Sequence, residues 1–248
     1  MKINKSILTN NDCYKARKTI KVKGLMLHSV GVPQPNARVF VKSWNKSVGV
    51  GVHAFVDGLN GEIYQTLPWN HRGWHCGGSG NNTHIGIEMC EPDCIQYTRG
   101  ASFHCTNNSR ALAIVDRTYN AAVELFAYLC KQYDLDPMTD IISHSEGHKK
   151  GIASGHADPE HLWKGLNTGF TMDKFRKDVK AKMSGSSSYK VLITTASLNV
   201  RNGAGMQCGI VTQVHKGEVY TIVDEKSGWG KLKSGAGWIY LPGYTERV

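Results

Sequence analysis

The chain has 248 residues, of which 40% are hydrophobic, and this is enough for one large domain or two smaller ones. The net charge of +10 suits a polyanionic partner. The sequence contains no block of like charges, so we expect no basic tail. No segment approaches the roughly 18 apolar residues of a membrane-spanning helix, so we expect no membrane insertion. The first ten residues lack the apolar core of a signal peptide, and the seven cysteines are irregularly spaced, so we expect synthesis in a cytoplasm.

The first part of the chain predicts short strands and one helix. The apolar run 24–28 indicates a buried strand that ends in His28. Asn36 is placed to cap a helix with apolar residues on one face. Two strand-like segments, 51–57 and 62–66, flank a glycine-containing turn and predict a hairpin.

The segment 69–82 is rich in glycine, histidine and tryptophan, which is typical of a loop that lines a groove. We expect Trp74 and His75 to contact the substrate there. The apolar strand that follows contains an acid, Glu88, for which an exposed structural position is the alternative. Strand alternation puts Gly86 on the same face, and we expect its missing side chain to leave open space beside the carboxylate.

The strongest helical pattern covers 109–133, where apolar residues recur at steps of three and four. A predicted strand at 140–143 then leads into a stretch that holds four of the 11 histidines, with glycines and a proline that prevent one continuous helix. Imidazoles and carboxylates are ligands that zinc prefers. For this stretch alone, a solvated surface loop is the alternative. Thr171 is placed to cap a last helix.

The final quarter of the chain has a different character. Five short β-rich runs alternate with turns within about sixty residues, which indicates a small barrel with a binding role. A serine-rich segment precedes it. We therefore expect a first domain at 1–182, a linker at 183–188 and a second domain at 189–248.

Three motifs carry a family resemblance: Leu27-His28-Ser29, Ile85-Gly86-Ile87-Glu88, and the stretch from His144 to Asp158. In this order they resemble the zinc-dependent N-acetylmuramoyl-L-alanine amidases of the type-2 amidase family, which includes peptidoglycan-recognition proteins. The tail resembles a bacterial SH3 domain in its Gly228-Trp229 and Gly237-Trp238-Ile239 motifs. The resemblance implies an α/β domain with a mixed central sheet flanked by helices, followed by a small all-β, SH3-like barrel. This organisation is similar to a phage or prophage endolysin of a Gram-positive host.

The resemblance also implies a site. His28, His144 and Asp158 would bind Zn²⁺, and Glu88 would act as the general base. Several relatives carry a catalytic lysine two residues before the third ligand, where this chain has His156. His156 would therefore stabilise the oxyanion, or it would replace Asp158 as the ligand.

The implied reaction is hydrolysis of the amide between N-acetylmuramic acid and the L-alanine of the stem peptide. The alternatives are a zinc peptidase of the stem peptide and a non-catalytic peptidoglycan-binding protein. Trp229, Trp238 and Tyr240 of the tail would bind the cell wall. We expect peptidoglycan as the partner, with anionic wall polymers as a second candidate and no nucleic acid. The protein would act on the wall after release from the cytoplasm.

Overall fold

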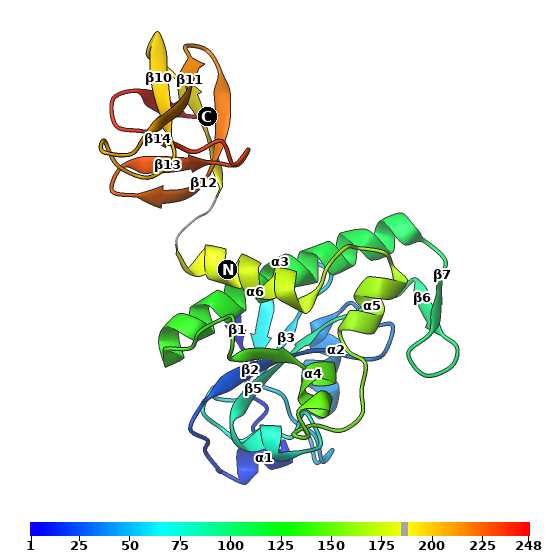
Figure 1. Ribbon diagram of the computed structural model, residues 1–248. Helices are drawn as coiled ribbons and strands as arrows, with labels where there is room; N and C mark the ends of the chain where they lie inside the picture. The colour runs from blue at the N-terminus through cyan, green and yellow to red at the C-terminus, as the bar shows by residue number, and fades with distance from the viewer. Residues whose placement is uncertain (185–187) are drawn as a thin grey trace. The chain divides into compact units, whose positions relative to one another are not determined.

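The computed structural model describes residues 1–184 and 188–248, which form two compact units, Met1–Lys180 and Ala181–Val248 (Figure 1). The expected linker includes residues 185–187, which lie outside the described residues. Within the described ranges, no helix combines the length and the apolar character needed to cross a bilayer.

The N-terminal unit is a mixed sheet with helices on both faces. Its elements in chain order are β1 (Ile3–Lys5), α1 (Asp12–Lys15), β2 (Gly24–Ser29), α2 (Ala37–Trp44), β3 (Ala54–Val56), β4 (Ile63–Gln65), β5 (His84–Met89), β6 (Ile95–Tyr97), β7 (Phe103–Cys105), α3 (Asn108–Tyr133), β8 (Ile141–Ser143), α4 (His144–Lys149), α5 (Glu160–Gly165) and α6 (Met172–Met183). The sheet order is β1-β4-β3-β5-β2-β8, and β6 pairs with β7 separately. β2 runs parallel to both of its neighbours, whereas β3 and β4 are antiparallel. The predicted fold class is confirmed.

The local signals in the sequence explain where several elements begin. The side chain of Asn36 accepts a hydrogen bond from the backbone of Arg38 and caps α2, and Asn107 caps α3 in the same way. The histidine-rich stretch divides into α4 and α5, as its glycines predict. The sequence did not indicate β1, α1 or the β6–β7 hairpin, because such short elements show no clear hydrophobic periodicity.

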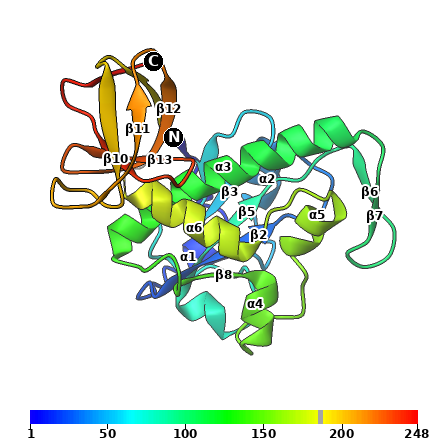
Figure 2. The ribbon, with the colours of Figure 1, turned by 45° about the horizontal axis from the view of Figure 1, so that its top comes forward.

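The two faces of the sheet differ in chemistry. Residues opposite one another in neighbouring strands point to the same side, so Tyr64, Phe55, Glu88 and His28 share one face. α2 covers part of this face, with the Phe40 ring stacked on Phe55 at 5.0 Å. α3 and α6 pack on the opposite face, which receives the alternate, mostly apolar residues (Figure 2). His28 and Glu88 therefore lie on the face opposite α3 and α6, beside the apolar contacts of α2.

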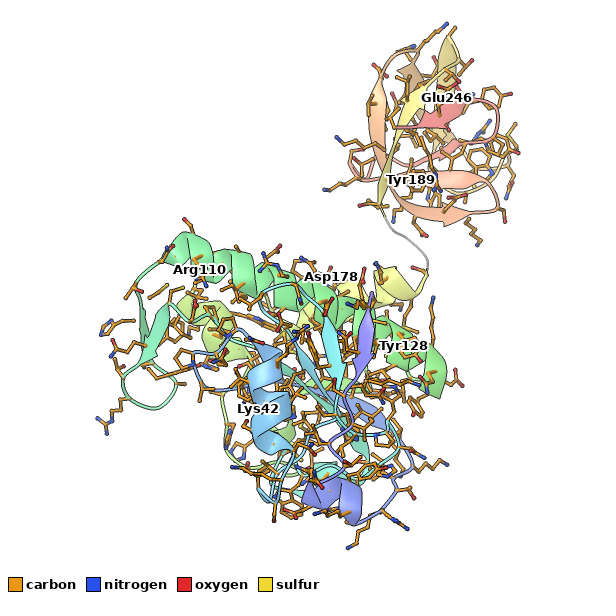
Figure 3. All side chains as sticks on the ribbon, turned by 180° about the vertical axis from the view of Figure 1, so that it is seen from behind. Lys42, Arg110, Tyr128, Asp178, Tyr189 and Glu246 are labelled. Carbon is orange, nitrogen blue, oxygen red and sulfur yellow. The ribbon has the colours of Figure 1, made fainter. Side chains whose placement is uncertain are left out.

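Aromatic side chains join α3 to α6. The Phe175 ring of α6 packs edge-on against Tyr119 and Phe126 of α3, at centroid distances of 5.4 and 5.0 Å. The Tyr119 hydroxyl donates to Asp178 at 2.8 Å. Figure 3 shows α3 from behind, with Arg110 and Tyr128 marking its course and Asp178 on α6 beside it. This layer forms a rigid support behind the sheet.

The C-terminal unit is a small all-β domain, as predicted. Its strands are β9 (Tyr189–Ile193), β10 (Ser197–Arg201), β11 (Ile210–His215), β12 (Val219–Lys226), β13 (Trp229–Leu232), β14 (Trp238–Tyr240) and β15 (Thr245–Arg247). Within residues 188–248 they form one sheet in the order β11-β10-β14-β13-β12-β9-β15 around a core that includes Val200, Ile222 and Ile239. The five predicted strands correspond to β10–β14. The sequence did not indicate β9 and β15, which pair with each other. β9 directly follows the serine-rich segment.

Truncating Phe175 should test the support behind the sheet. Phe175→Ala removes a fully buried ring and leaves a cavity between α3 and α6. We expect the free energy of unfolding to fall by about 3–5 kcal/mol, measured by urea denaturation of the full chain. Lys177→Ala, at an exposed position of the same helix, should change it by less than about 0.5 kcal/mol. Equal effects of the two changes would contradict the assigned packing.

Candidate metal centre

Three residues that are far apart in the sequence meet at the carboxyl ends of β2 and β8. His28 lies near the end of β2, His144 directly follows β8, and Asp158 precedes α5. The carboxyl ends of parallel strands lie at one edge of a sheet, which brings the two histidines together. Ser143 and Glu146 form a capping box at the start of α4, so the backbone that carries His144 is fixed by two reciprocal hydrogen bonds.

The potential ligand atoms of these residues converge. His28 Nδ1 lies 3.0 Å from His144 Nδ1 and 3.3 Å from Asp158 Oδ2, and His144 Nδ1 lies 3.5 Å from Asp158 Oδ1. All three residues are buried. Ligands about 2.0–2.1 Å from a tetrahedral ion such as zinc lie roughly 3.3 Å from one another. The donor set and its spacing therefore fit a small divalent cation.

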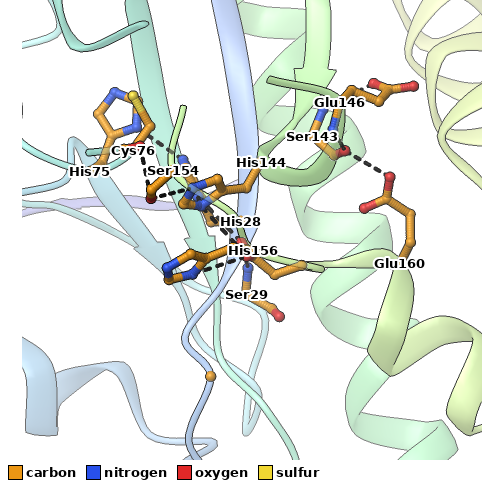
Figure 4. A network of polar contacts seen from close by, with 12 residues as sticks. His28, Ser29, His75, Cys76, Ser143, His144, Glu146, Ser154, His156 and Glu160 are labelled. Carbon is orange, nitrogen blue, oxygen red and sulfur yellow. Dashed lines mark hydrogen bonds and ion pairs between the residues drawn. The ribbon is translucent and has the colours of Figure 1, made fainter. Parts of the chain in front are cut away.

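Each histidine of this group has a second partner on its other ring nitrogen. His28 Nε2 lies 2.9 Å from His75 Nδ1, and His144 Nε2 lies 3.3 Å from Ser154 Oγ (Figure 4). Loss of hydration lowers the pKa of the His28 and His75 imidazoles, so both rings are neutral at neutral pH. Metal-ligating histidines normally use such an outer partner to fix the ring. The motifs in the sequence did not reveal these partners.

Glu88 faces the same cavity from the neighbouring strand. It is paired with His28 in the β2–β5 register, and both line a cavity of about 790 Å³. Its Oε2 atom is buried and has no hydrogen-bond partner among the described residues. Loss of hydration, together with the charges of Asp158 and Glu91, raises the pKa of Glu88 well above its ordinary value. Such a carboxylate is well suited to take up a proton.

The expectation of open space beside Glu88 is wrong. A Cβ atom at Gly86 would collide with the imidazole ring of His75. The position that the glycine leaves free is therefore occupied by that ring, which reaches across from the preceding loop. The sequence shows that a side chain is missing at residue 86, but it does not show which neighbour fills the space.

The other expected site residues occupy different positions. His156 lies at the rim, with 59% of its side chain exposed, and its ring stacks on His144 at 4.4 Å. Its Nδ1 is 3.7 Å from Asp158 Oδ1, outside the group of three ligands among the described residues. His75 contributes to the cavity wall. Trp74 is 44% exposed and lies under the guanidinium of Arg72, away from the described lining of this cavity.

A buried carboxylate beside the site was not recognised in the sequence. Glu91 is fully buried and accepts hydrogen bonds from Ser29 Oγ, the Gly31 amide and the Tyr97 hydroxyl, at 2.6, 3.1 and 2.7 Å. Tyr97 Oη also lies 2.7 Å from His161 Nε2. The network ties the β6–β7 hairpin and the loop after β2 to the cavity. Its members are up to 132 positions apart, so no local pattern announces them.

A family model described as N-acetylmuramoyl-L-alanine amidase matches residues 18–161, more than half of the chain. The chain belongs to the N-acetylmuramoyl-L-alanine amidase family. A second model, the bacterial SH3 domain, matches residues 196–245. Both findings confirm the resemblance drawn from the sequence motifs, and residues 18–161 of the amidase domain contain all three converging ligands.

Individual relatives support the same assignment. The chain is 30% identical to the N-acetylmuramoyl-L-alanine amidase CwlA of a Bacillus species over 110 residues, which are 43% of this chain and 36% of CwlA. It is 64% identical to the amidase XlyA of Bacillus subtilis (strain 168) over 33 residues, which are 12% of this chain and 11% of XlyA. The chain thus matches about a third of the length of CwlA and less of XlyA.

Solved structures show that the fold is shared. The catalytic domain of PlyG superposes with a TM-score of 0.51 at 21% identity, covering 74% of this chain and 96% of that domain. A mutant form of PlyL gives a TM-score of 0.51 at 22% identity, covering 73% of this chain and 99% of that chain.

Metal binding should depend on the three converging residues. We expect His28→Ala, His144→Ala and Asp158→Ala each to weaken Zn²⁺ binding by more than about 100-fold, because loss of an outer partner alone costs about 10- to 100-fold. His156→Ala should retain the metal, since its ring lies at the rim. Competition with a chromophoric chelator measures the affinities. Zinc lost from His156→Ala and kept by Asp158→Ala would make His156 the third ligand.

Proposed function

We propose that this protein is a zinc-dependent amidase that hydrolyses the bond between N-acetylmuramic acid and the L-alanine of the peptidoglycan stem peptide. The observation that carries the proposal is the buried group His28, His144 and Asp158, which opens into a cavity that also holds Glu88. The family match and the names of CwlA and XlyA support the same activity.

The residues of the cavity have distinct roles in this reaction. Zinc, when bound, polarises a carbonyl group and lowers the pKa of water from about 16 to about 7. Glu88 accepts a proton from the attacking water and passes it to the amine of L-alanine as the amide bond breaks. His156, at the rim beside Asp158, donates an N–H to the oxyanion of the tetrahedral intermediate.

The reaction product identifies the activity. Purified Gram-positive cell walls are digested with the full chain, and the new amines are identified by mass spectrometry. A stem peptide with a free N-terminal L-alanine is the result expected of an amidase. A new amine within the stem peptide would instead indicate a zinc peptidase, and binding without any product would indicate a non-catalytic binder.

Glu88→Gln should separate catalysis from binding. The amide keeps the shape of the side chain and removes the base, so turnover should fall by at least about 100-fold while zinc and peptidoglycan still bind. Wall lysis and zinc content are measured on one preparation. Glu62→Gln is a matched control, because Glu62 lies outside the described lining of this cavity and contacts Lys2, Asn4 and Tyr64 instead. Near-normal lysis by the Glu88 variant would eliminate it as the base.

We further propose that the C-terminal unit binds peptidoglycan. A cavity of about 600 Å³ in this unit is lined by Trp229, Tyr240 and Tyr244, with polar groups such as Arg201 and Gln213. Aromatic faces with a few polar groups suit a wall glycopeptide. Trp229 is 6% exposed and packs 5.3 Å from Tyr240, so it forms part of the floor. Trp238 lies outside this lining as described, with its ring near Lys231. The net charge of +10 supports additional attraction to anionic wall polymers.

Aromatic truncation tests the wall-binding role. Tyr240→Ala in the full chain should weaken cosedimentation with host walls by about tenfold or more, because it removes a central aromatic contact. Tyr128→Ala, which truncates an exposed tyrosine on α3 outside this cavity, should leave binding unchanged. Unaltered binding by both variants would exclude this cavity as the wall site.

We also propose that the protein is made in a cytoplasm and acts on the wall after release. In the described part of the chain all seven cysteines are free, and Cys76, Cys90 and Cys130 are buried. Reduced thiols are the normal state in that compartment.

A further inference from the structure

The hydrogen bonds around the two ligand histidines determine where their protons lie. His75 Nε2 lies 3.1 Å from the backbone carbonyl oxygen of His84. A carbonyl oxygen only accepts, so this nitrogen carries the proton of the neutral His75 ring. His75 Nδ1 is therefore an acceptor, and His28 Nε2, 2.9 Å away, is the donor. His28 is left with a lone pair on Nδ1, the atom that faces His144 and Asp158.

His144 is fixed by a second chain of hydrogen bonds. Ser154 Oγ donates to the carbonyl oxygen of Cys76 at 3.2 Å. A hydroxyl has one proton, so Ser154 accepts from His144 Nε2, and His144 also presents a lone pair on Nδ1. Both chains end at backbone carbonyls, which cannot reverse their direction. Figure 4 shows His75 and Cys76 together with the two ligand histidines.

We propose that His75 is a positioning residue for the metal centre, which holds His28 in the tautomer and orientation that present Nδ1 to the cation. This inference rests on the proposed metal-dependent function. Gly86 gives the His75 ring its space in β5. Asn81 Oδ1 accepts the backbone N–H groups of His75 and Cys76, at 2.8 and 3.2 Å, and so holds one residue of each hydrogen-bond chain.

Metal affinity is the direct readout of such a role. Without the acceptor on His75, His28 can place its proton on Nδ1 or rotate, and either change competes with metal binding. His75→Phe keeps an aromatic ring and removes the acceptor, so we expect the affinity of the full-length apoprotein for Zn²⁺ and Co²⁺ to fall by about 10- to 100-fold. His75→Asn places an amide oxygen near the position of Nδ1 and should restore most of the affinity.

His53 provides a matched control. It is a fully buried histidine in the same part of the domain, its ring lies 5.9 Å from that of His75, and it bonds to the backbone of Gly86 and His71. His53→Phe should lower the free energy of unfolding without changing metal affinity. A loss of affinity in His53→Phe equal to that in His75→Phe would overturn the inference, because packing alone would then explain both.

The tautomer can be measured without any substitution at His75. Long-range ¹H–¹⁵N spectra of the wild-type protein should show His28 protonated at Nε2 and bare at Nδ1, with its signals identified by their loss in His28→Gln. A proton on Nδ1 of His28 in the metal-free protein, or undiminished affinity of a folded His75→Phe protein, would overturn the inference. Failure of the wild-type protein to bind zinc would instead contradict the proposed function itself.

Discussion

Two imidazole nitrogens and a carboxylate face one another inside this protein, and the neighbouring hydrogen bonds leave no proton between them. Such a cluster of acceptors is unfavourable in a buried place unless a cation joins it. The surrounding structure must therefore hold His28, His144 and Asp158 against their mutual repulsion. The parallel pairing of β2 with β8, the capping box of α4 and the two outward hydrogen-bond chains all serve this requirement.

The sheet separates the chemistry from its mechanical support. Because side chains alternate along a strand, one set of positions in β2 and β5 carries His28 and Glu88, and the other set packs beneath α3 and α6. The aromatic contacts around Phe175 thus stabilise the site from behind without entering it. A one-residue shift in the register of β5 would move Glu88 to the wrong face while leaving its sequence neighbours unchanged.

The sequence predicts most of the fold, because the strands and helices depend on local patterns, and the expected ligands come from the family resemblance of three short motifs. His28 and His144 end predicted strands, and Asn36 caps a helix where its spacing indicates. The supporting contacts were not predictable, since they depend on pairings between distant segments. Glu91 meets Ser29 and Tyr97 only in the folded chain. Trp74 and His75 are neighbours in the same loop, and the sequence suggests the same role for both. In the structure the Trp74 ring is exposed, whereas the His75 ring contacts the ligand residue His28.

The contact between Gly86 and His75 links two positions that a comparison of sequences would treat as independent. Any side chain at residue 86 needs the volume that the imidazole of His75 occupies. A larger residue can therefore replace Gly86 only after His75 has been substituted or its ring has moved. The same coupling limits redesign of the domain. A library that varies the glycine alone will return mostly damaged metal centres, whereas one that varies both positions together explores alternative outer partners for His28.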